Sequence, residues 1–117
     1  MSRKIPKRCS DLADLIRIDE DAYMKSLGFI EISGVAAAID ALDLMCKAAD
    51  VQLVTWERKM GGRLVTLVVE GDVSAVTAAI ENASAHAIKK PCASLVIARP
   101  HEETMRIVNL SAERLKK

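Results

Sequence analysis

The sequence of 117 residues has few aromatic side chains, few prolines and little excess charge of either sign. Its three aromatic residues, Tyr23, Phe29 and Trp56, lie far apart along the chain. Such a set offers no platform on which the bases of a single strand could stack. A net charge of +1 gives no overall basic field that would attract nucleic acid. The sequence therefore argues against a nucleic-acid-binding protein.

Long hydrophobic runs are also missing, since no apolar stretch approaches the roughly 20 residues of a membrane-spanning helix. The basic segment Met1–Arg8 is not followed by the apolar region of a secretory signal. The three cysteines, Cys9, Cys46 and Cys92, are odd in number and widely spaced. This pattern indicates free thiols in a reducing compartment, so we expect a cytoplasmic protein. Cys46 falls on the apolar stripe of an expected helix, and we predict that it is buried.

Catalytic and metal-binding patterns are absent as well. His86 and His101 have no second His or Cys at metal-ligand spacing. The pair Gly61-Gly62 does not lead into a helix with the Lys-Ser/Thr end of a phosphate-binding loop. Glu102 and Glu103 are adjacent, so on a helix they point in different directions and do not form a paired-carboxylate site. We predict no enzyme activity, no cofactor and no metal site.

Half of the residues are hydrophobic, mostly Ala, Val, Leu and Ile, and the length suits one domain. We divide the chain into an N-terminal extension, residues 1–26, and a core module, residues 27–117. Alternation and helical periodicity in the core predict four strands and three helices. The expected strands are 27–32, 51–57, 64–70 and 93–98, and the expected helices are 35–49, 72–87 and a short one from about residue 99.

The order of these elements is that of the split βαβ, or ferredoxin-like, plan, βαββαβ with a short C-terminal helix. We therefore predict an α/β (α+β) domain with a four-stranded antiparallel sheet and both long helices on one face. The run 64–69 is apolar on both sides of its strand. The second face of the sheet must then be covered by the C-terminal helix, the N-terminal extension or another subunit.

A basic turn stands between the second and third expected strands. The segment 56–63 reads Trp-Glu-Arg-Lys-Met-Gly-Gly-Arg, and two adjacent glycines between strands are typical of a hairpin turn with positive φ. Arg58, Lys59 and Arg63 place three positive charges on this turn. Two interpretations are open at this point. The turn is either a solvated hairpin tip, or several copies of it meet and line an opening.

Several separate segments of the core resemble bacterial microcompartment shell proteins. They are 27–31 (Leu-Gly-Phe-Ile-Glu), 36–41, 43–51, 62–66, 71–76 and 97–103 (Ile-Ala-Arg-Pro-His-Glu-Glu). They occur in the same order as in the single-domain members of that family and span residues 27–108. The resemblance implies a structural shell subunit that forms flat homohexamers, which tile into sheets with a central pore for small metabolites.

Particular positions take expected roles from this resemblance. The turn after the second strand lines the pore in the family, which here implies Lys59, Met60, Gly61, Gly62 and Arg63. Lys47 matches the lysine at the edge between neighbouring hexamers. Arg99 matches the arginine that reaches across the same edge, with Pro100 and His101 beside it. The implied partners are further copies of the chain, other shell proteins and encapsulated enzymes, with no nucleic acid and no membrane.

Two features depart from the family pattern. The turn is about one residue longer than usual and carries Arg63 where a glycine is expected, so six copies around one axis would bring six arginines together. The extension is the second departure, and it can cover the free sheet face, bind a neighbour or change the assembly. Similar extensions occur in some shell proteins of choline-utilisation and other glycyl-radical-enzyme compartments, which suggests that subtype.

Other classes of function remain as alternatives. A ferredoxin-like small-molecule-binding regulatory domain would hold a ligand at a subunit interface and assemble only into small oligomers. An electron-transfer module would need cysteines at the turn, and segment 56–63 contains none.

Overall fold

The computed structural model describes residues 25–116 of the chain. The predicted extension, residues 1–26, lies almost entirely outside this range. The described elements are β1 (Ser26–Ile32), α2 (Val35–Ala48), β2 (Gln52–Lys59), the short 3₁₀ turn η2 (Met60–Gly62), β3 (Leu64–Gly71), α3 (Val73–His86), β4 (Ala93–Ile97) and α4 (Glu102–Leu115).

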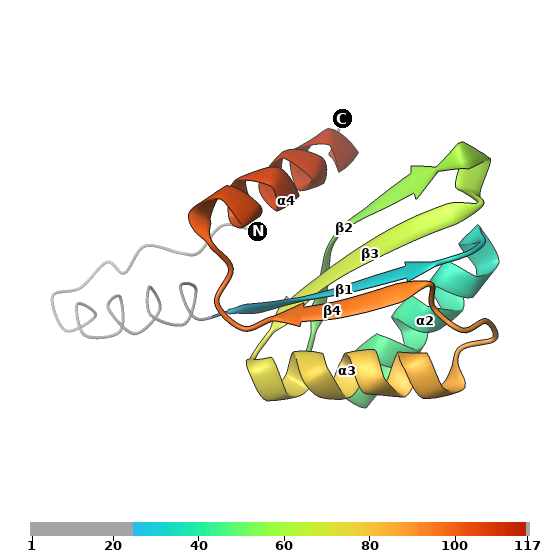
Figure 1. The fold of residues 1–117 in the computed structure, drawn as a ribbon. Helices are drawn as coiled ribbons and strands as arrows, with labels where there is room; N and C mark the ends of the chain where they lie inside the picture. The colour runs from blue at the N-terminus through green and yellow to red at the C-terminus, as the bar shows by residue number, and fades with distance from the viewer. Residues whose placement is uncertain (1–24, 117) are drawn as a thin grey trace, which may run out of the picture.

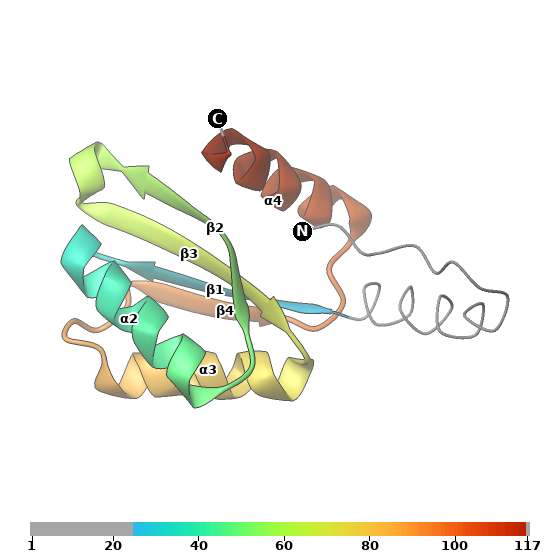
Figure 2. The ribbon, with the colours of Figure 1, turned by 180° about the vertical axis from the view of Figure 1, so that it is seen from behind.

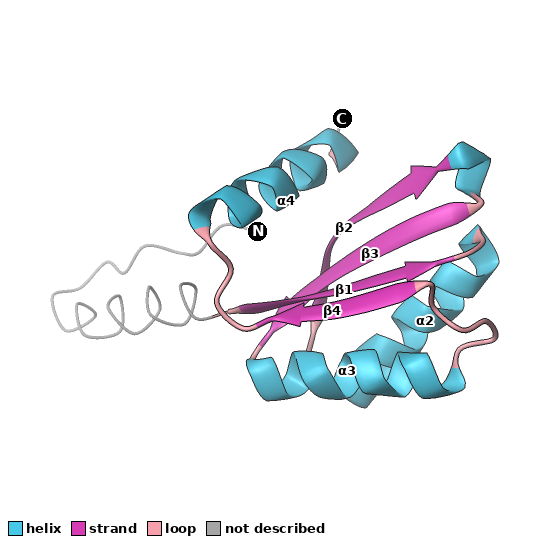
Figure 3. Cartoon of the chain, viewed as in Figure 1, coloured by secondary structure: helices cyan, strands magenta, loops and turns pink. Residues whose placement is uncertain are grey.

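The four strands form one antiparallel sheet in the order β2-β3-β1-β4. Helices α2 and α3 lie together on one face of this sheet, and α4 lies on the other side (Figures 1 and 2). Figure 3, coloured by secondary structure, shows the sheet with α2 and α3 on one side and α4 on the other. The predicted ferredoxin-like α+β plan is therefore confirmed.

Small side chains bring the α2–α3 layer close to the sheet. Ala38 and Ala41 of α2 and Ala79 and Ala83 of α3 are fully buried in the main core. Gly28 of β1 faces α3 so closely that an added Cβ would lie 2.6 Å from Cγ1 of Val76. A side chain there would push α3 away from the sheet, because a packed core does not absorb extra atoms without strain. The high alanine content thus serves close helix–sheet packing.

The second face of the sheet is partly covered by α4. Val108 of α4 is buried with Leu27 of β1 and Val68 of β3, and Phe29, Val54 and Met105 pack around them. Met105 and Val108 therefore face the sheet. The predicted shortness of this helix is wrong, since α4 has 14 residues, as many as α2 or α3. Leu95 of β4 stays 53% exposed, so α4 leaves part of this face open.

The buried side of α2 differs from the predicted one. Its buried residues are Ala37, Ala38, Ala41 and Met45, whereas Ile39 is 54% exposed and Cys46 is exposed. The prediction of a buried Cys46 is therefore wrong. Close packing selects the side of the helix that carries three alanines and Met45, and this leaves Ile39 and Cys46 facing outward. Desolvation and the nearby Asp43 carboxylate raise the pKa of Cys46, so its thiol stays protonated at neutral pH.

The start of the C-terminal helix also needs a correction. Pro100 was expected in its first turn, but the helix begins at Glu102 and His101 is the N-cap. The ring nitrogen Nδ1 of His101 accepts a hydrogen bond of 3.1 Å from the backbone N–H of Glu103. Glu102 and Glu103 lie in the first turn, where negative charge is favourable.

Candidate functional site

The hairpin turn between β2 and β3 is held in an unusual backbone conformation. Met60, Gly61 and Gly62 follow one another with φ of 52°, 67° and 90°. The N–H of Arg63 donates to the carbonyl oxygen of Met60 at 3.3 Å and closes the turn. The predicted hairpin is confirmed, but the turn is wider than a two-residue primed turn because Met60 joins the two glycines at positive φ.

This turn is fixed to the start of α2. The N–H of Gly34 donates to the carbonyl oxygen of Arg63 at 3.2 Å. A Cβ added at Gly62 would lie 2.9 Å from Cγ2 of Val35. The turn is thus attached both to its own hairpin and to the helix that packs beneath the sheet. Its position relative to the core is set by these contacts.

The five residues predicted to line a pore come together at this tip. Lys59, Met60, Gly61 and Arg63 are exposed, and Gly62 is half-buried. The thioether side chain of Met60 is 66% exposed, although methionine usually packs inside. An exposed, conformationally fixed tip suits contact with another copy or with a solute.

Two of the three cations near the tip have local partners. The guanidinium of Arg58 lies 5.2 Å from the centroid of the Trp56 ring, a cation–π contact. The Nζ atom of Lys59 lies 3.6 Å from Oε1 of Glu57. Arg63 stands at the end of the turn with its side chain exposed. Arg58, Lys59 and Arg63 are all exposed, so the tip as a whole carries positive charge.

Glu57 links the base of the hairpin to α4. Its Oε2 accepts a hydrogen bond from the Ser111 hydroxyl and another, at 3.0 Å, from Nη2 of Arg114. Since the single hydroxyl hydrogen of Ser111 goes to Glu57, the buried Thr55 hydroxyl donates to Ser111 Oγ at 2.7 Å. The hydrogen bond from Ser111, followed by that from Arg114, holds the pKa of Glu57 below its ordinary value although desolvation opposes the shift.

Sequence reasoning missed this network. Glu57 was noted only as part of the basic segment, and Ser111 and Arg114 were given no role. A signal was present, because alternation along β2 puts Thr55 and Glu57 on one face of the strand. Their polar side chains then require a partner on the element that covers that face.

The residues predicted for an inter-hexamer edge lie at the opposite end of the sheet. Lys47 is in the last turn of α2, about 18 Å from Val35 at the helical rise of about 1.5 Å per residue. Its Nζ pairs with Oδ2 of Asp43 at 2.8 Å, and this hydrogen bond raises the pKa of Lys47. Both side chains are largely exposed, so the ammonium group remains accessible.

Arg99, Pro100 and His101 form the link between β4 and α4 at this same end. The hydroxyl of Ser26, the first residue of β1, donates to the carbonyl oxygen of Ala98 at 3.0 Å and fixes the start of the link. Ser26 also pairs with Gly71, the end of β3 that lies away from the turn. Arg99 and His101 are exposed, and Pro100 is half-buried.

Within residues 25–116, no group of three or more His, Cys, Asp or Glu side chains is arranged to hold a metal ion. No helix in the same range has both the length and the apolar character needed to cross a membrane. What the described part of the chain offers is an α+β domain with a fixed basic turn at one end and exposed basic residues at the other.

Comparison with known proteins identifies this class. The BMC domain, the family of bacterial microcompartment shell proteins, matches residues 26–100, and the chain belongs to this family. It is 44% identical over 86 residues to the bacterial microcompartment shell protein PduA of Citrobacter freundii. This alignment covers 72% of this chain and 91% of PduA. It is also 41% identical over 92 residues to the carboxysome shell protein CsoS1A of Hydrogenovibrio crunogenus, covering 75% and 94% of the two chains.

A solved structure agrees with this assignment. A microcompartments protein from Desulfitobacterium hafniense superposes with a TM-score of 0.65 and 25% identity over 75% of this chain. The match spans 48% of that solved chain, about half of its length. The family and the shell-protein resemblance expected from the sequence are therefore confirmed.

The geometry of the turn predicts different costs for its two glycines. We expect Gly62→Ala to destabilise the fold by about 1–3 kcal/mol, because it combines positive φ with a contact to Val35. Gly61→Ala is the matched control, since an added Cβ meets nothing within 4 Å and only the backbone preference is lost. Urea unfolding measures both variants, and equal losses would contradict the proposed contact.

The Glu57 network predicts a pH-dependent contribution to stability. The folded pKa of Glu57 is lowered, so its contribution is present above the unfolded pKa and is lost as the pH falls through the folded value. We expect the free energy of unfolding of the wild type to exceed that of Glu57→Gln by about 1–2 kcal/mol at pH 7. This difference should shrink as the pH falls below 4.5, the ordinary pKa of a glutamate side chain. Glu81→Gln, on exposed α3, is the control; a Glu57→Gln difference that is unchanged down to pH 3 would contradict the network.

Proposed function

The chain is a structural subunit of a bacterial microcompartment shell, and we propose how it assembles. Six copies form a homohexameric ring with the β2–β3 turn of each copy at the central axis, where Lys59, Met60, Gly61, Gly62 and Arg63 line a pore. The observation that carries this proposal is the exposed turn, which is fixed to α2 by the Gly34–Arg63 hydrogen bond. Without this hydrogen bond the turn would have no fixed position relative to α2, and the copies would not line an opening of defined shape.

Glycine at the turn supports close approach of several copies to one axis. Gly61 and Gly62 have no side chains, so backbones from neighbouring subunits can come near one another. The backbone N–H groups and the Arg63 side chains then face the opening. Such a lining favours anions and polar metabolites.

The proposed ring also explains why the local pairing of cations matters. Six copies would gather six arginines and six lysines at the axis, and like charges at short range repel. Within each subunit the Glu57 carboxylate lies near both Lys59 and Arg114, so it offsets the charge of Lys59 only in part. The cations at the axis are then the Lys59 and Arg63 side chains, which an anion between them would stabilise.

The opposite end of the subunit forms the edge at which rings tile into sheets. We propose that Lys47 lies at this edge and that Arg99 reaches across it, with Pro100 and His101 alongside. Exposure of Lys47, Arg99 and His101 supports this role. The pore and the edge then use opposite ends of one rigid domain, so assembly and transport do not compete for residues.

The partners follow from this arrangement. Further copies of the chain, other shell proteins and the enclosed enzymes are its proposed contacts, and the chain itself carries out no reaction. The names of its relatives as shell proteins support a structural role.

Assembly tests the two proposed interfaces separately. We expect the full chain to form hexamers in native mass spectrometry and sheets or tubes in negative-stain micrographs. Lys47→Ala or Arg99→Ala should reduce sheet formation at least several-fold and leave the hexamer intact, because each removes a charged contact at the edge only. Lys89→Ala, which changes an exposed lysine after α3, is the control.

Two results would count against this proposal. Sheets that form equally well in both edge variants would overturn the edge assignment. A discrete dimer in place of the hexamer would overturn the ring.

A further inference from the structure

The part of the sheet face that α4 leaves open contains a shallow hollow. It has a volume of about 190 Å³ and is lined by Phe29, Glu31, Thr66, Ala93, Ser94 and Leu95. Phe29 of β1 and Leu95 of β4 are cross-strand partners, and Leu95 is 53% exposed. One water molecule takes a share of about 30 Å³, so the hollow has room for an aliphatic side chain.

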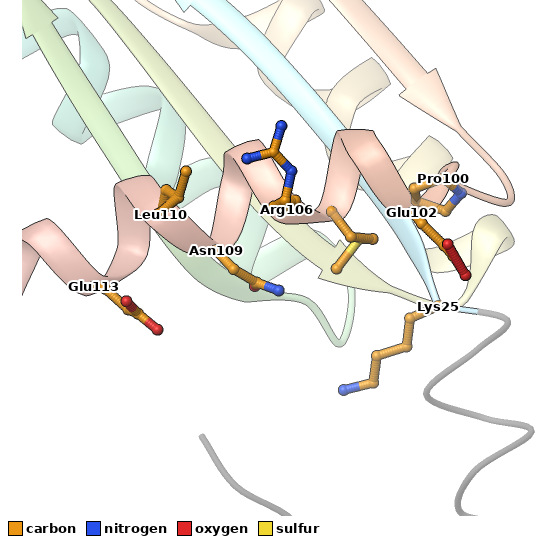
Figure 4. Close-up of a pocket in the computed structure, with 8 residues that line it drawn as sticks. Lys25, Pro100, Glu102, Arg106, Asn109, Leu110 and Glu113 are labelled. Atoms are coloured by element: carbon orange, nitrogen blue, oxygen red, sulfur yellow. The ribbon is translucent and has the colours of Figure 1, made fainter.

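This hollow differs in character from a larger groove along α4. That groove has a volume of about 460 Å³, and its lining includes Lys25 and Arg106 as well as Glu102 and Glu113 (Figure 4). Charged groups lose hydration when an apolar side chain covers them, so such a lining does not favour an apolar contact. Glu31 is the only charged residue among the described residues that line the hollow. The hollow is therefore the better candidate for an apolar contact.

Exposed aliphatic residues stand on the opposite side of the sheet. Ile88, in the loop between α3 and β4, is 69% exposed. Its backbone N–H donates to Oδ2 of Asp40 in α2 at 2.9 Å, so this loop is fixed to the helical layer. Ile39, the neighbour of Asp40 in α2, is 54% exposed. The helical side of the domain thus presents apolar side chains from two segments that a hydrogen bond joins.

Both surfaces lie near the end of the sheet that carries the β2–β3 turn. Glu31 pairs with Thr66, which is two residues beyond the first residue of β3. The backbone N–H of Cys92, at the end of the α3–β4 loop, donates to the carbonyl oxygen of Glu31 at 2.7 Å. Figures 1 and 2 show this loop and the turn at the same end of the domain. In the proposed ring this end is nearest the axis, where neighbouring copies converge.

A ring requires two different contact surfaces on each copy. Closed rings are built from head-to-tail contacts, in which one patch of a copy meets a different patch of the next copy. The hollow and Ile88 lie on opposite faces of the sheet, so they can meet neighbours in opposite directions around the ring. The charges also match, because Lys90 is exposed two residues after Ile88 and Glu31 borders the hollow.

We propose that Ile88 of one copy docks in the hollow of the next copy, against Phe29 and Leu95, and that Lys90 pairs with Glu31 across this contact. The contact rests on the ring of the proposed function and names the surfaces through which adjacent subunits meet. Since both surfaces lie at the turn end of the domain, the contact also sets how closely adjacent turns approach one another.

Disulfide trapping between two full chains tests the contact. The three native cysteines are changed to Ser, and a copy with Ile88→Cys is co-expressed with a copy that carries Leu95→Cys. In the control, the second copy carries Ile107→Cys instead, because Ile107 of α4 is 63% exposed and is thus at least as accessible as Leu95. Each copy then has a single cysteine, so every disulfide is a link between chains.

We expect the Ile88–Leu95 link to form at least tenfold faster than the control link under mild oxidation, measured on non-reducing gels. Native mass spectrometry before oxidation reports whether hexamers are present. Hexamers in which the Ile88–Leu95 link is absent or no faster than the control would overturn this contact and leave the ring in place. Absence of hexamers would overturn the ring and this contact with it. A faster link between two Leu95→Cys copies would show that two hollows face each other and would also overturn the contact.

Charge reversal gives a second measurement at the same contact. Glu31→Lys places a cation opposite Lys90, so we expect the hexamer to dissociate at a several-fold higher protein concentration than the wild type. Adding Lys90→Glu should restore wild-type behaviour, because opposite charges face each other again. Glu113→Lys, at an exposed position of α4, is the control. Mass photometry during dilution measures dissociation; no rescue in the double variant, or an equal loss in the control, would contradict the Lys90–Glu31 pair.

Discussion

The functional arrangement of this domain depends on one short backbone constraint. Met60, Gly61 and Gly62 adopt positive φ in succession, and the carbonyl oxygen of Arg63 accepts a hydrogen bond from Gly34 at the start of α2. Residues without a Cβ adopt this conformation at little cost, whereas Met60 adopts it against its steric preference. The constraint fixes where the tip of the hairpin points. The conformation of the turn therefore determines the shape of any opening that several copies form.

Close packing fixes the position of the hairpin tip relative to the rest of the domain. The alanine sides of α2 and α3 and the bare backbone of Gly28 hold the helical layer against the sheet. Helix α2 begins beside the turn and ends with Lys47 in its last turn, so one rigid element spans both ends. On the other face, Glu57 connects the base of the hairpin to Ser111 and Arg114 of α4. The ends of the domain are thus joined by elements that leave little room for independent movement.

Periodicity predicted the element order and the sheet correctly, because strands and helices differ clearly in the spacing of their apolar residues. It placed the hairpin at Gly61-Gly62, but it could not show that Met60 shares their positive φ. It also misjudged α2, where Cys46 and Ile39 face outward, since hydrophobicity alone does not reveal that close packing favours the alanine side. The Glu57 network was missed because its members are more than fifty residues apart in the sequence.

The central claim is that the Met60–Arg63 turns of several subunits meet at one axis. Cryo-electron microscopy of the assembled full chain tests this most directly, because it shows both the number of subunits and the position of each turn. The account predicts a closed ring of six subunits with the turns lining its central opening and the Lys47 and Arg99 ends at the perimeter. An assembly whose turns face solvent away from any symmetry axis would contradict it.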